Sequence, residues 1–450
     1  MSLLRADQDL TRASYYAATA PRTLSFAALG EAIEVDVAIV GGGLAGLSAA
    51  IELADRGFSV VLLEAREVGW GASGRNGGQA IHGLACDQST IEEQLGLDEA
   101  KRIWAMSIEA LDLIRARIAR FDIDCDWQDG YLGLAVSERK SAELRVWRDR
   151  MQQVYGYPMG WIDGGDMPRW IASPRYVGGV HDPRSGHLHP LKYSLGLARA
   201  AASLGVRIQE GSAVTGLEQG RNGAPSVVRT ATGSVKARQV LLAGNVYLPE
   251  FGPELAPALS ARIMPVGTYI VCSEPLGEQR CNALIPSRSA VCDTNFVLDY
   301  FRPTRDHRLL YGGRVSYSAV TPMNLADSMR KRMVGTFPQL DGIKIDHAWG
   351  GFVDISMNRA PDFGRLPAGG AAGGAAVSSA SSVYYLQGFS GHGLALTGLA
   401  GKLVAEAMAG DASRFDTFAR LRHRSFPGGR LLRTPALVLG MAYYRLRDAL

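Results

Sequence analysis

Residues 35–65, VDVAIVGGGLAGLSAAIELADRGFSVVLLEA, decide the fold class of this 450-residue chain. They begin with a short apolar run, typical of a buried β-strand, that ends in the glycines 41–43. Apolar residues then recur at helical spacing from Leu44, and a second strand-like run ends in Glu64. A strand, a glycine turn, a helix, a strand and a terminal acid are the parts of a dinucleotide-binding βαβ unit. The stretch therefore predicts a Rossmann-like α/β domain.

Each glycine of the turn has a physical role. Gly41 permits the tight turn, Gly43 lets the backbone approach a pyrophosphate, and Gly46 lets helix and strand pack closely. The phosphates are expected at the helix N-terminus, where unpaired N–H groups favour negative charge. Glu64 follows Gly46 by 18 residues, where its carboxylate can accept hydrogen bonds from ribose hydroxyls and would repel a 2′-phosphate.

The composition is that of an ordinary soluble globular protein. Hydrophobic residues make up 47% of the chain and charged residues 20%, and this length predicts about two or three domains. The net charge of +4, from 48 basic and 44 acidic residues, is too balanced to indicate nucleic-acid binding. Residues 1–20 lack the apolar core of a signal peptide, and the absence of any apolar run of about 18 residues argues against a transmembrane helix.

The cysteines indicate a cytoplasmic protein with reduced thiols. They are odd in number and form no CxxC pair: Cys86, Cys125, Cys272, Cys281 and Cys292. Neither a disulfide framework nor a zinc site is therefore expected. His187 and His189 precede a predicted helix at Pro190, and no third ligand is spaced near them, so no metal site is predicted.

Two further glycine-rich loops extend the nucleotide site. Residues 68–79, VGWGASGRNGGQ, carry five glycines directly after the acid-ended strand, which favours contact of their backbone N–H groups with a flat or anionic ligand. Residues 388–393, GFSGHG, lie between a predicted strand and a predicted helix, whose N-terminus is again aimed at a ligand. A strand at 235–244 should end beside the nucleotide. Loops this far apart indicate a cofactor of the size of FAD, whose reduced ring carries charge at N1–C2=O that N–H groups can stabilise.

The remaining patterns place the other elements. Helical periodicity predicts helices at 90–120, 138–155, 190–204 and 394–409. Strand-like patterns predict an antiparallel sheet within 262–347 and extended segments at 129–136 and 206–217. The Trp, Gly and Pro content of residues 156–186 predicts irregular structure, and residues 368–375 are expected to form a low-complexity loop.

These elements predict two main domains, α/β in class and α+β overall. The FAD-binding domain is expected to comprise residues 35–85, 186–261 and 346–425. The mainly antiparallel β substrate domain is expected to comprise residues 86–185 and 262–345. An N-terminal arm at 1–34 and a helical tail at 426–450 complete the chain.

The chain resembles the D-amino-acid-oxidase-like family of FAD amine oxidases. The resemblance is carried by residues 36–65, by LLAGN at 241–245 and by GFSGHGLALTGLAGKLVAEAM at 388–408. Within that family, SYYAATA, VGWGASGRNGGQ and FPGGRLLRTP are most similar to the γ-glutamylputrescine oxidase branch.

The resemblance implies oxidation of a C–N bond by hydride transfer to the flavin. The resulting imine would be hydrolysed to an aldehyde and ammonia, and O₂ would reoxidise the flavin to give hydrogen peroxide. The branch implies γ-glutamylputrescine, or a related γ-glutamylated polyamine, as substrate and a role in polyamine catabolism. Relatives with covalent flavin place a cysteine near the segment DISMNRAPD, where this chain has Ser356 and Met357, so non-covalent FAD is expected.

Candidate site residues follow from the loops and from the resemblance. FAD contacts are expected from Gly41, Gly43, Leu44, Ala45, Gly46, Glu64, Ala65, Gly71, Ala72, Ser73, Arg75, Asn76, Gly77, Gly78, Gln79, Val214, Gly244, Asn245, Gly388, Gly391, His392, Gly393 and Leu394. The catalytic candidates are His392, Tyr300 and Arg302. His392 could handle a proton or could shape its loop, because hydride transfer from a neutral amine needs no base. Arg302 could bind a substrate carboxylate in a bidentate manner or form a surface ion pair.

Three alternatives to an amine oxidase stay open. One is oxidation of D-amino acids or N-methyl amino acids instead of a γ-glutamylated amine. Another is a dehydrogenase that passes electrons to a membrane quinone, which only the Arg-flanked apolar segment at 436–444 supports, and membrane association is not expected. The last is a flavin-binding protein without turnover, against which a complete substrate domain argues.

Overall fold

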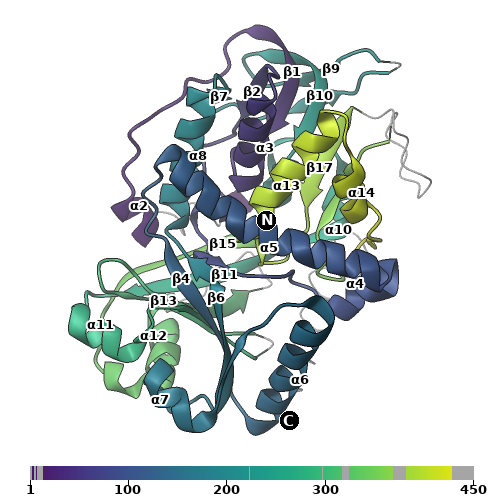
Figure 1. Ribbon diagram of the computed structural model, residues 1–450. Helices are drawn as coiled ribbons and strands as arrows, with labels where there is room; N and C mark the ends of the chain where they lie inside the picture. The colour runs from purple at the N-terminus through teal and green to yellow at the C-terminus, as the bar shows by residue number, and fades with distance from the viewer. Residues whose placement is uncertain are drawn as a thin grey trace.

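The computed structural model of the protein describes residues 3, 4, 7, 14–221, 223–295, 297–316, 324–367 and 382–427. Within them the chain forms two β-sheets, which occupy the upper and lower parts of Figure 1, with helix α5 (Leu97–Phe121) crossing the middle of the view. The predicted loop at 368–375 and all but the first two residues of the predicted tail at 426–450 lie outside the described residues.

The first sheet contains the predicted βαβ unit. Its main path is β16–β17–β10–β1–β2–β7, and β9 joins β8 to β10. The strands from β17 to β7 are parallel, whereas β16 and β9 run antiparallel to their neighbours. The bounds are β1 Ala32–Val40, β2 Val60–Leu63, β7 Arg207–Gln209, β8 Gly216–Glu218, β9 Ser226–Arg229, β10 Ser234–Leu242, β16 Asp362–Arg365 and β17 Val383–Gln387. The predicted order of β1, glycine turn, α3 (Leu44–Asp55) and β2 is confirmed.

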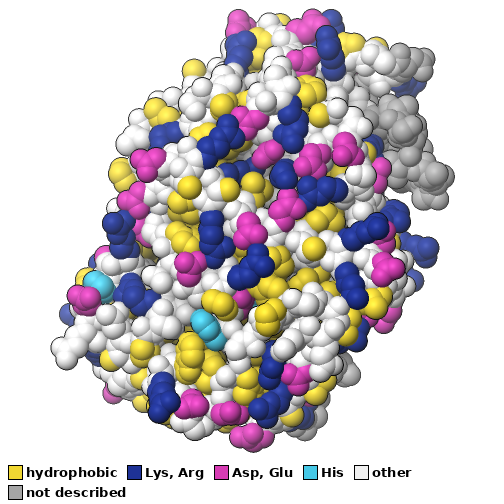
Figure 2. All heavy atoms as spheres, viewed as in Figure 1, with side chains coloured by type: hydrophobic (Ala, Val, Ile, Leu, Met, Phe, Trp, Pro, Cys, Tyr) yellow, Lys and Arg dark blue, Asp and Glu magenta, His cyan; other side chains and the backbone are white. Residues whose placement is uncertain are grey.

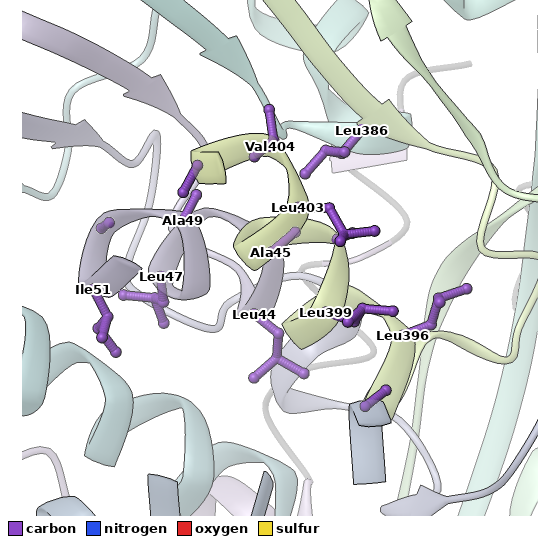
Figure 3. Packing of buried hydrophobic residues seen from close by; sticks show 14 of the residues in the cluster. Leu44, Ala45, Leu47, Ala49, Ile51, Leu386, Leu396, Leu399, Leu403 and Val404 are labelled. Carbon is purple, nitrogen blue, oxygen red and sulfur yellow. The ribbon is translucent and has the colours of Figure 1, made fainter. Parts of the chain in front are cut away.

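Helices α3, α5, α8 (Pro190–Ser203) and α13 (Gly393–Met408) bury the apolar core on one face of this sheet. Figure 3 shows α3 and α13 side by side, with leucine, isoleucine and valine side chains of both helices labelled. A Cβ added at Gly401 would stand 2.5 Å from the Cβ of Ser48. The missing side chain therefore allows α13 to pack directly on α3, the helix that begins at the glycine turn.

The opposite face of the first sheet carries a smaller apolar cluster. It includes residues of α9 (Leu248–Phe251), of α10 (Pro257–Arg262) and of the segment between them; the short helix η3 (Asn245–Tyr247) precedes α9. The other short elements are α2 Tyr15–Thr19, η1 Ala72–Gly74 and α14 Ser413–Ala419. Both faces of the parallel strands are thus covered, as expected for a doubly wound α/β sheet.

The second sheet is mainly antiparallel, with the order β15–β11–β14–β13–β12–β4–β6–β3 and with β5 paired to β6. The pair β12–β4 is parallel. The bounds are β3 Gln79–Ala80, β4 Gln128–Ala135, β5 Gly160–Ile162, β6 Gly178–His187, β11 Ile263–Ser273, β12 Ala290–Asp293, β13 Tyr300–Pro303, β14 Leu309–Ser316 and β15 Ile345–Ser356. The accompanying helices are α6 Glu138–Tyr155, η2 Gly164–Asp166, α7 Met167–Trp170, α11 Glu278–Leu284, α12 Leu325–Thr336 and η4 Pro338–Leu340.

Two sequence predictions about local structure are wrong. The segment 156–186, predicted as irregular, contains β5, α7 and most of β6. Pro183 lies exposed within β6, where the pairing of β4 with β6 shifts register, and such a bulge tolerates a residue without an N–H. The helix predicted at 90–120 is two helices, α4 (Gln88–Leu95) and α5, because Gly96 adopts a φ of +85° between them.

The packing also differs from the predicted division of the chain. Helices α4 and α5 contribute to the core of the first sheet, although residues 86–185 were assigned to the substrate domain. Strand β15 belongs to the second sheet, although residues 346–425 were assigned to the FAD-binding domain. Strand β15 pairs along its length with β11, and its last residues approach the first sheet.

The surface in Figure 2 shows basic and acidic side chains interspersed over the face toward the viewer. This face carries no broad patch of positive or of negative charge, which agrees with the balanced net charge of +4.

None of the helices within the described part of the chain is both long enough and apolar enough to cross a membrane.

Candidate functional site

A cavity of about 1310 Å³ is lined by residues of both sheets. From the first sheet come Val40, Leu63 and Ala243, at or just after the carboxyl ends of three parallel strands. The second sheet contributes residues of β11, β13 and β15. Ligands of open α/β sheets bind beyond the carboxyl ends of the strands. The cavity therefore lies where a nucleotide is expected.

The end of the cavity at which the nucleotide is expected is built from the glycine turn and Glu64. One carboxylate oxygen of Glu64 accepts the N–H of Gly42 at 2.7 Å, and the other accepts the N–H of Arg66 at 2.8 Å. Burial raises the pKa of Glu64, against these hydrogen bonds. The predicted contact residues that line this end are Gly41, Gly43, Leu44, Ala45, Glu64, Ala65, Val214, Gly244 and Asn245. Gly46 does not line the cavity, and its role is in the packing of α3 beneath the turn.

Replacing Glu64 by Gln should weaken FAD binding about tenfold to a hundredfold without unfolding the protein. The substitution keeps the size of the side chain but removes the charge that strengthens hydrogen bonds to ribose hydroxyls, which is worth about 1.5–3 kcal/mol. FAD titration of the apoprotein, followed by fluorescence, measures the change, and thermal unfolding of the apoprotein is the control. An unchanged affinity would place the ribose elsewhere.

The second glycine loop crosses from the nucleotide end toward the second sheet. Its lining residues are Trp70, Gly71, Ala72, Ser73, Arg75, Asn76, Gly77 and Gln79, whereas Gly78 lies outside the cavity lining. Arg75 is buried, donates from Nε to the carbonyl of Trp70 at 2.6 Å and pairs with Asp7 at 2.9 Å. Its Nη2 is buried without a hydrogen-bond partner among the described residues. Arg75 therefore places a buried positive charge beside the second glycine loop, at a residue that lines the cavity.

The third glycine loop joins β17 to α13. Gly391, His392, Gly393 and Leu394 line the cavity, and Gly388 does not. The His392 Nε2 lies 2.9 Å from the carbonyl oxygen of His82 and 3.3 Å from that of Ile81, so it carries the hydrogen and donates it. Burial lowers the pKa of His392 to about 4, and the ring is therefore neutral at pH 7. Through these hydrogen bonds His392 holds the loop against the segment that follows β3. A role of His392 in proton transfer stays a prediction.

The wall formed by the second sheet carries polar side chains suited to a small substrate. The Tyr300 hydroxyl lies 3.3 Å from Thr268 Oγ1, and Cys292 donates to Gln79 Oε1 at 2.9 Å. All four residues line the cavity. Burial raises the pKa of Tyr300 and that of Cys292, so both stay protonated at neutral pH. Thr268 and Cys292 were not predicted as site residues, because alternation within a strand does not reveal which of its faces meets a cavity.

Arg302 is placed differently from the sequence prediction. Its side chain does not line the cavity and is 2% exposed. Nε donates to the carbonyl of Gly77 at 2.8 Å, and Nη2 donates to the hydroxyl of Tyr16 at 3.0 Å. Arg302 thus fixes the second glycine loop and the N-terminal helix α2. Neither predicted role, a substrate carboxylate partner or a surface ion pair, fits this arrangement.

Asp354 and Asn358 also line the cavity and were not among the predicted site residues. Both belong to the segment DISMNRAPD, which also contains Ser356 and Met357. The sequence signal for Asp354 as a site residue was a carboxylate within the otherwise apolar run GGFVDIS.

No group of three or more His, Cys, Asp and Glu side chains suited to a metal ion occurs among the described residues.

Comparisons with known proteins agree with this geometry. The family model described as "FAD dependent oxidoreductase" (DAO) matches residues 36–407. The chain is 44% identical to the gamma-glutamylputrescine oxidoreductase of Escherichia coli, over 97% of this chain and 98% of that protein. It is 39% identical to the probable oxidoreductase OrdL of Haemophilus influenzae, over 97% of each chain. The crystal structure of glycine oxidase from Geobacillus kaustophilus superimposes with a TM-score of 0.67 at 22% identity, over 84% of this chain and 95% of that one, and so shares the fold.

The residues present fit FAD. The cavity exceeds the roughly 300–1,000 Å³ of ordinary small-ligand pockets, and a Cβ at Gly43 would stand 2.8 Å from Ser73 Oγ in the narrow passage between two glycine loops. Polar side chains that line the same cavity, among them Glu64, Ser73 and Asn76, suit a cofactor with hydroxyl, phosphate and ring N–H groups. When bound, FAD supplies a ring that accepts a hydride. By the family match and the full-length similarity, the chain belongs to the DAO family of FAD-dependent oxidoreductases.

Proposed function

We propose that the protein oxidises the primary amine of γ-glutamylputrescine, or of a related γ-glutamylated polyamine, with O₂ as electron acceptor. The observation that carries the proposal is the 44% identity to a gamma-glutamylputrescine oxidoreductase across nearly the full length of both chains. The aligned region covers 97% of this chain and so includes most of the second sheet, which supplies one wall of the cavity.

The overall reaction balances as one amine, one O₂ and one water giving one aldehyde, one ammonia and one hydrogen peroxide. The C–H bond next to the nitrogen breaks, two electrons leave the substrate, and water then replaces the nitrogen. Tyr300, Gln79 and Thr268 would orient the reacting carbon, and the neutral ring of His392 would hold the third glycine loop in place. We also propose that FAD is held without a covalent bond, because Ser356 and Met357 stand where covalent relatives place a cysteine.

Flavin reduction by γ-glutamylputrescine should accelerate as the pH rises from about 7 to about 9 and then level off. Only the neutral amine can lose hydride, and free alkylamines titrate near pH 10, as lysine does. Desolvation in the cavity should lower that pKa in the complex, so the plateau should begin below pH 10. His392, with a pKa of about 4, cannot cause a rise in this window. Anaerobic stopped-flow bleaching of the flavin measures the rate.

The matched substrate control is putrescine, which has the same reacting amine without the glutamyl group. It should reduce the flavin far more slowly, because it lacks the remote contacts that orient the reacting carbon. Equal rates for the two amines, or bleaching only by D-amino acids or N-methylglycine, would move the substrate to another branch of the family. Turnover with an artificial acceptor but without peroxide would contradict the use of O₂.

A further inference from the structure

The third glycine loop has a backbone shape that residues far away in the sequence impose. Gly388, Ser390 and Gly391 have φ values of +80°, +53° and +84°. Glycine adopts this left-handed region freely, but for serine it is uncommon and needs support from surrounding contacts. The supports come from the end of β15, at Asp354 and Ser356.

Asp354 makes the principal contacts with this turn. A single carboxylate oxygen, Oδ2, accepts the N–H groups of both Gly388 and Phe389, the latter at 3.0 Å. The backbone carbonyl of Asp354 accepts the N–H of Ser390 at 2.9 Å. Two residues further on, the N–H of Ser356 donates to Ser390 Oγ at 3.2 Å. Three consecutive N–H groups of the turn are thus held by one residue.

The carboxylate of Asp354 is isolated from other charges. It is 3% exposed, lines the cavity and forms no ion pair among the described residues. Burial raises its pKa to about 6, against hydrogen bonds from Phe389, Gly388 and Asn245. The group therefore carries its negative charge at neutral pH, in a medium where a charge acts over a longer distance than in water.

We infer that Asp354 is a positioning residue that shapes the 388–391 turn, and that its charge lowers the reduction potential of the bound flavin. The inference rests on the flavin ring lying beside the third glycine loop, and it is independent of which amine is the substrate. A reduced flavin carries negative charge at N1–C2=O. A fixed carboxylate behind the turn opposes that charge, whereas the N–H groups and the start of α13 favour it.

The substitution Asp354→Asn separates the two roles. Asparagine keeps one oxygen that can accept both N–H groups, so the turn should persist while the charge is lost. The flavin in this variant should be easier to reduce: we expect sulfite, which adds to flavins whose negative charge is stabilised, to bind on the order of tenfold more tightly. A tenfold change corresponds to about 30 mV for a two-electron couple. Dye-linked potentiometry and sulfite titration read both quantities without any amine.

The matched control is Asp293→Asn. Asp293 is also buried, accepts the backbone N–H groups of Asn295 and Asp299 at 3.1 Å, and has a pKa raised by burial to about 6. It differs from Asp354 in that it pairs with Arg175 at 3.2 Å and does not line the cavity. This variant should leave the potential and the sulfite affinity unchanged. A shift of the same size in both variants would overturn the assignment to the 388–391 turn.

The substitution Asp354→Ala tests positioning. Removal of the acceptor should release the turn, lower the FAD content of the purified protein and alter the visible circular dichroism of any bound flavin. Retention of full FAD content with an unchanged spectrum would overturn the positioning role. An unchanged potential and sulfite affinity in Asp354→Asn would overturn the charge effect, including where the alanine variant does not fold. Failure of the proposed substrate would change neither measurement.

Discussion

The substitution Gly46→Ala is expected to yield protein that no longer retains FAD. A Cβ at this position would lie 2.0 Å from the carbonyl oxygen of Gly41 and 3.2 Å from Cγ2 of Ile39. The oxygen cannot move away readily, because the N–H of Gly41 is bonded to the carbonyl of Leu63 at 2.8 Å within the sheet. Helix α3 must therefore shift away from the turn. The backbone N–H groups at its N-terminus then no longer lie where the pyrophosphate is expected.

The loss should exceed that from any single contact on the cofactor. Overpacking a well-filled site costs about 1–3 kcal/mol in folding free energy, and the displaced helix N-terminus also removes several N–H groups from the phosphates. Flavin absorbance per protein after purification, followed by FAD titration of the apoprotein, measures the effect.

Gly335→Ala is the matched control for Gly46→Ala. Gly335 lies near the end of α12, is exposed, and has no atom within 4 Å of an added Cβ. Alanine should raise the free energy of unfolding there by up to about 1 kcal/mol, through its higher helix propensity, and should leave FAD content unchanged. Full FAD retention in Gly46→Ala would show that α3 and the glycine turn can separate without cost to the nucleotide site.

The second large effect is expected at Asp182, outside the cavity lining. Its buried carboxylate accepts hydrogen bonds from His82 Nδ1 at 2.6 Å, from the Tyr157 hydroxyl at 2.9 Å and from Ser185. It also accepts the N–H of Arg184 at 3.0 Å. Asp182→Ala leaves these groups without their partner in a buried site, and the free energy of unfolding should fall by about 3–5 kcal/mol. Urea denaturation measures the loss.

The pH dependence of the free energy of unfolding tests the role of Asp182 independently. Burial opposes ionisation of Asp182, but the hydrogen bond and charge of His82 and the bonds from Ser185 and Arg184 outweigh it and lower the pKa to about 2. A lowered pKa stabilises the fold above the unfolded-state value of about 3.9 and loses that contribution as the pH falls toward 2. The variant should therefore lose less stability between pH 5 and pH 3 than the parent protein does.

Asp112→Ala is the control for Asp182→Ala. Asp112 pairs with Arg184 at 2.9 Å, but its side chain is 58% exposed. Exposed pairs contribute about 0–1 kcal/mol. A loss in this variant as large as that in Asp182→Ala would contradict the importance of burial.

The features predicted most accurately were those with local signals. The glycine turn, the helix after it and the acid-ended strand are adjacent in the sequence, and the structure forms them as α3 between β1 and β2. Helix α6 matches its predicted bounds, with Ser137 as the capping residue and Gly156 in a left-handed conformation after its end. Its polar surface and end signals are encoded within the segment itself.

The features that were missed depend on partners far away in the sequence. Arg302 looked available for a substrate because nothing near it in sequence showed its contacts with Gly77 and Tyr16. Strand β6 was missed because its proline sits in a bulge that only pairing with β4 explains. Asp354 accepts hydrogen bonds from a turn that begins 34 residues later. Sequence periodicity shows which face of a helix or strand is buried, but not which residues pack against that face.

Strand β15 has a consequence for recombining this enzyme with its relatives. By composition, the glycine- and alanine-rich stretch at 368–375 is the obvious junction for a chimera, and it lies outside the described residues. A junction there would take Asp354 and Ser356 from one parent and the 388–391 turn from the other, although hydrogen bonds join the two. A chimera that is to keep these hydrogen bonds must therefore take the strand end and the turn from the same parent.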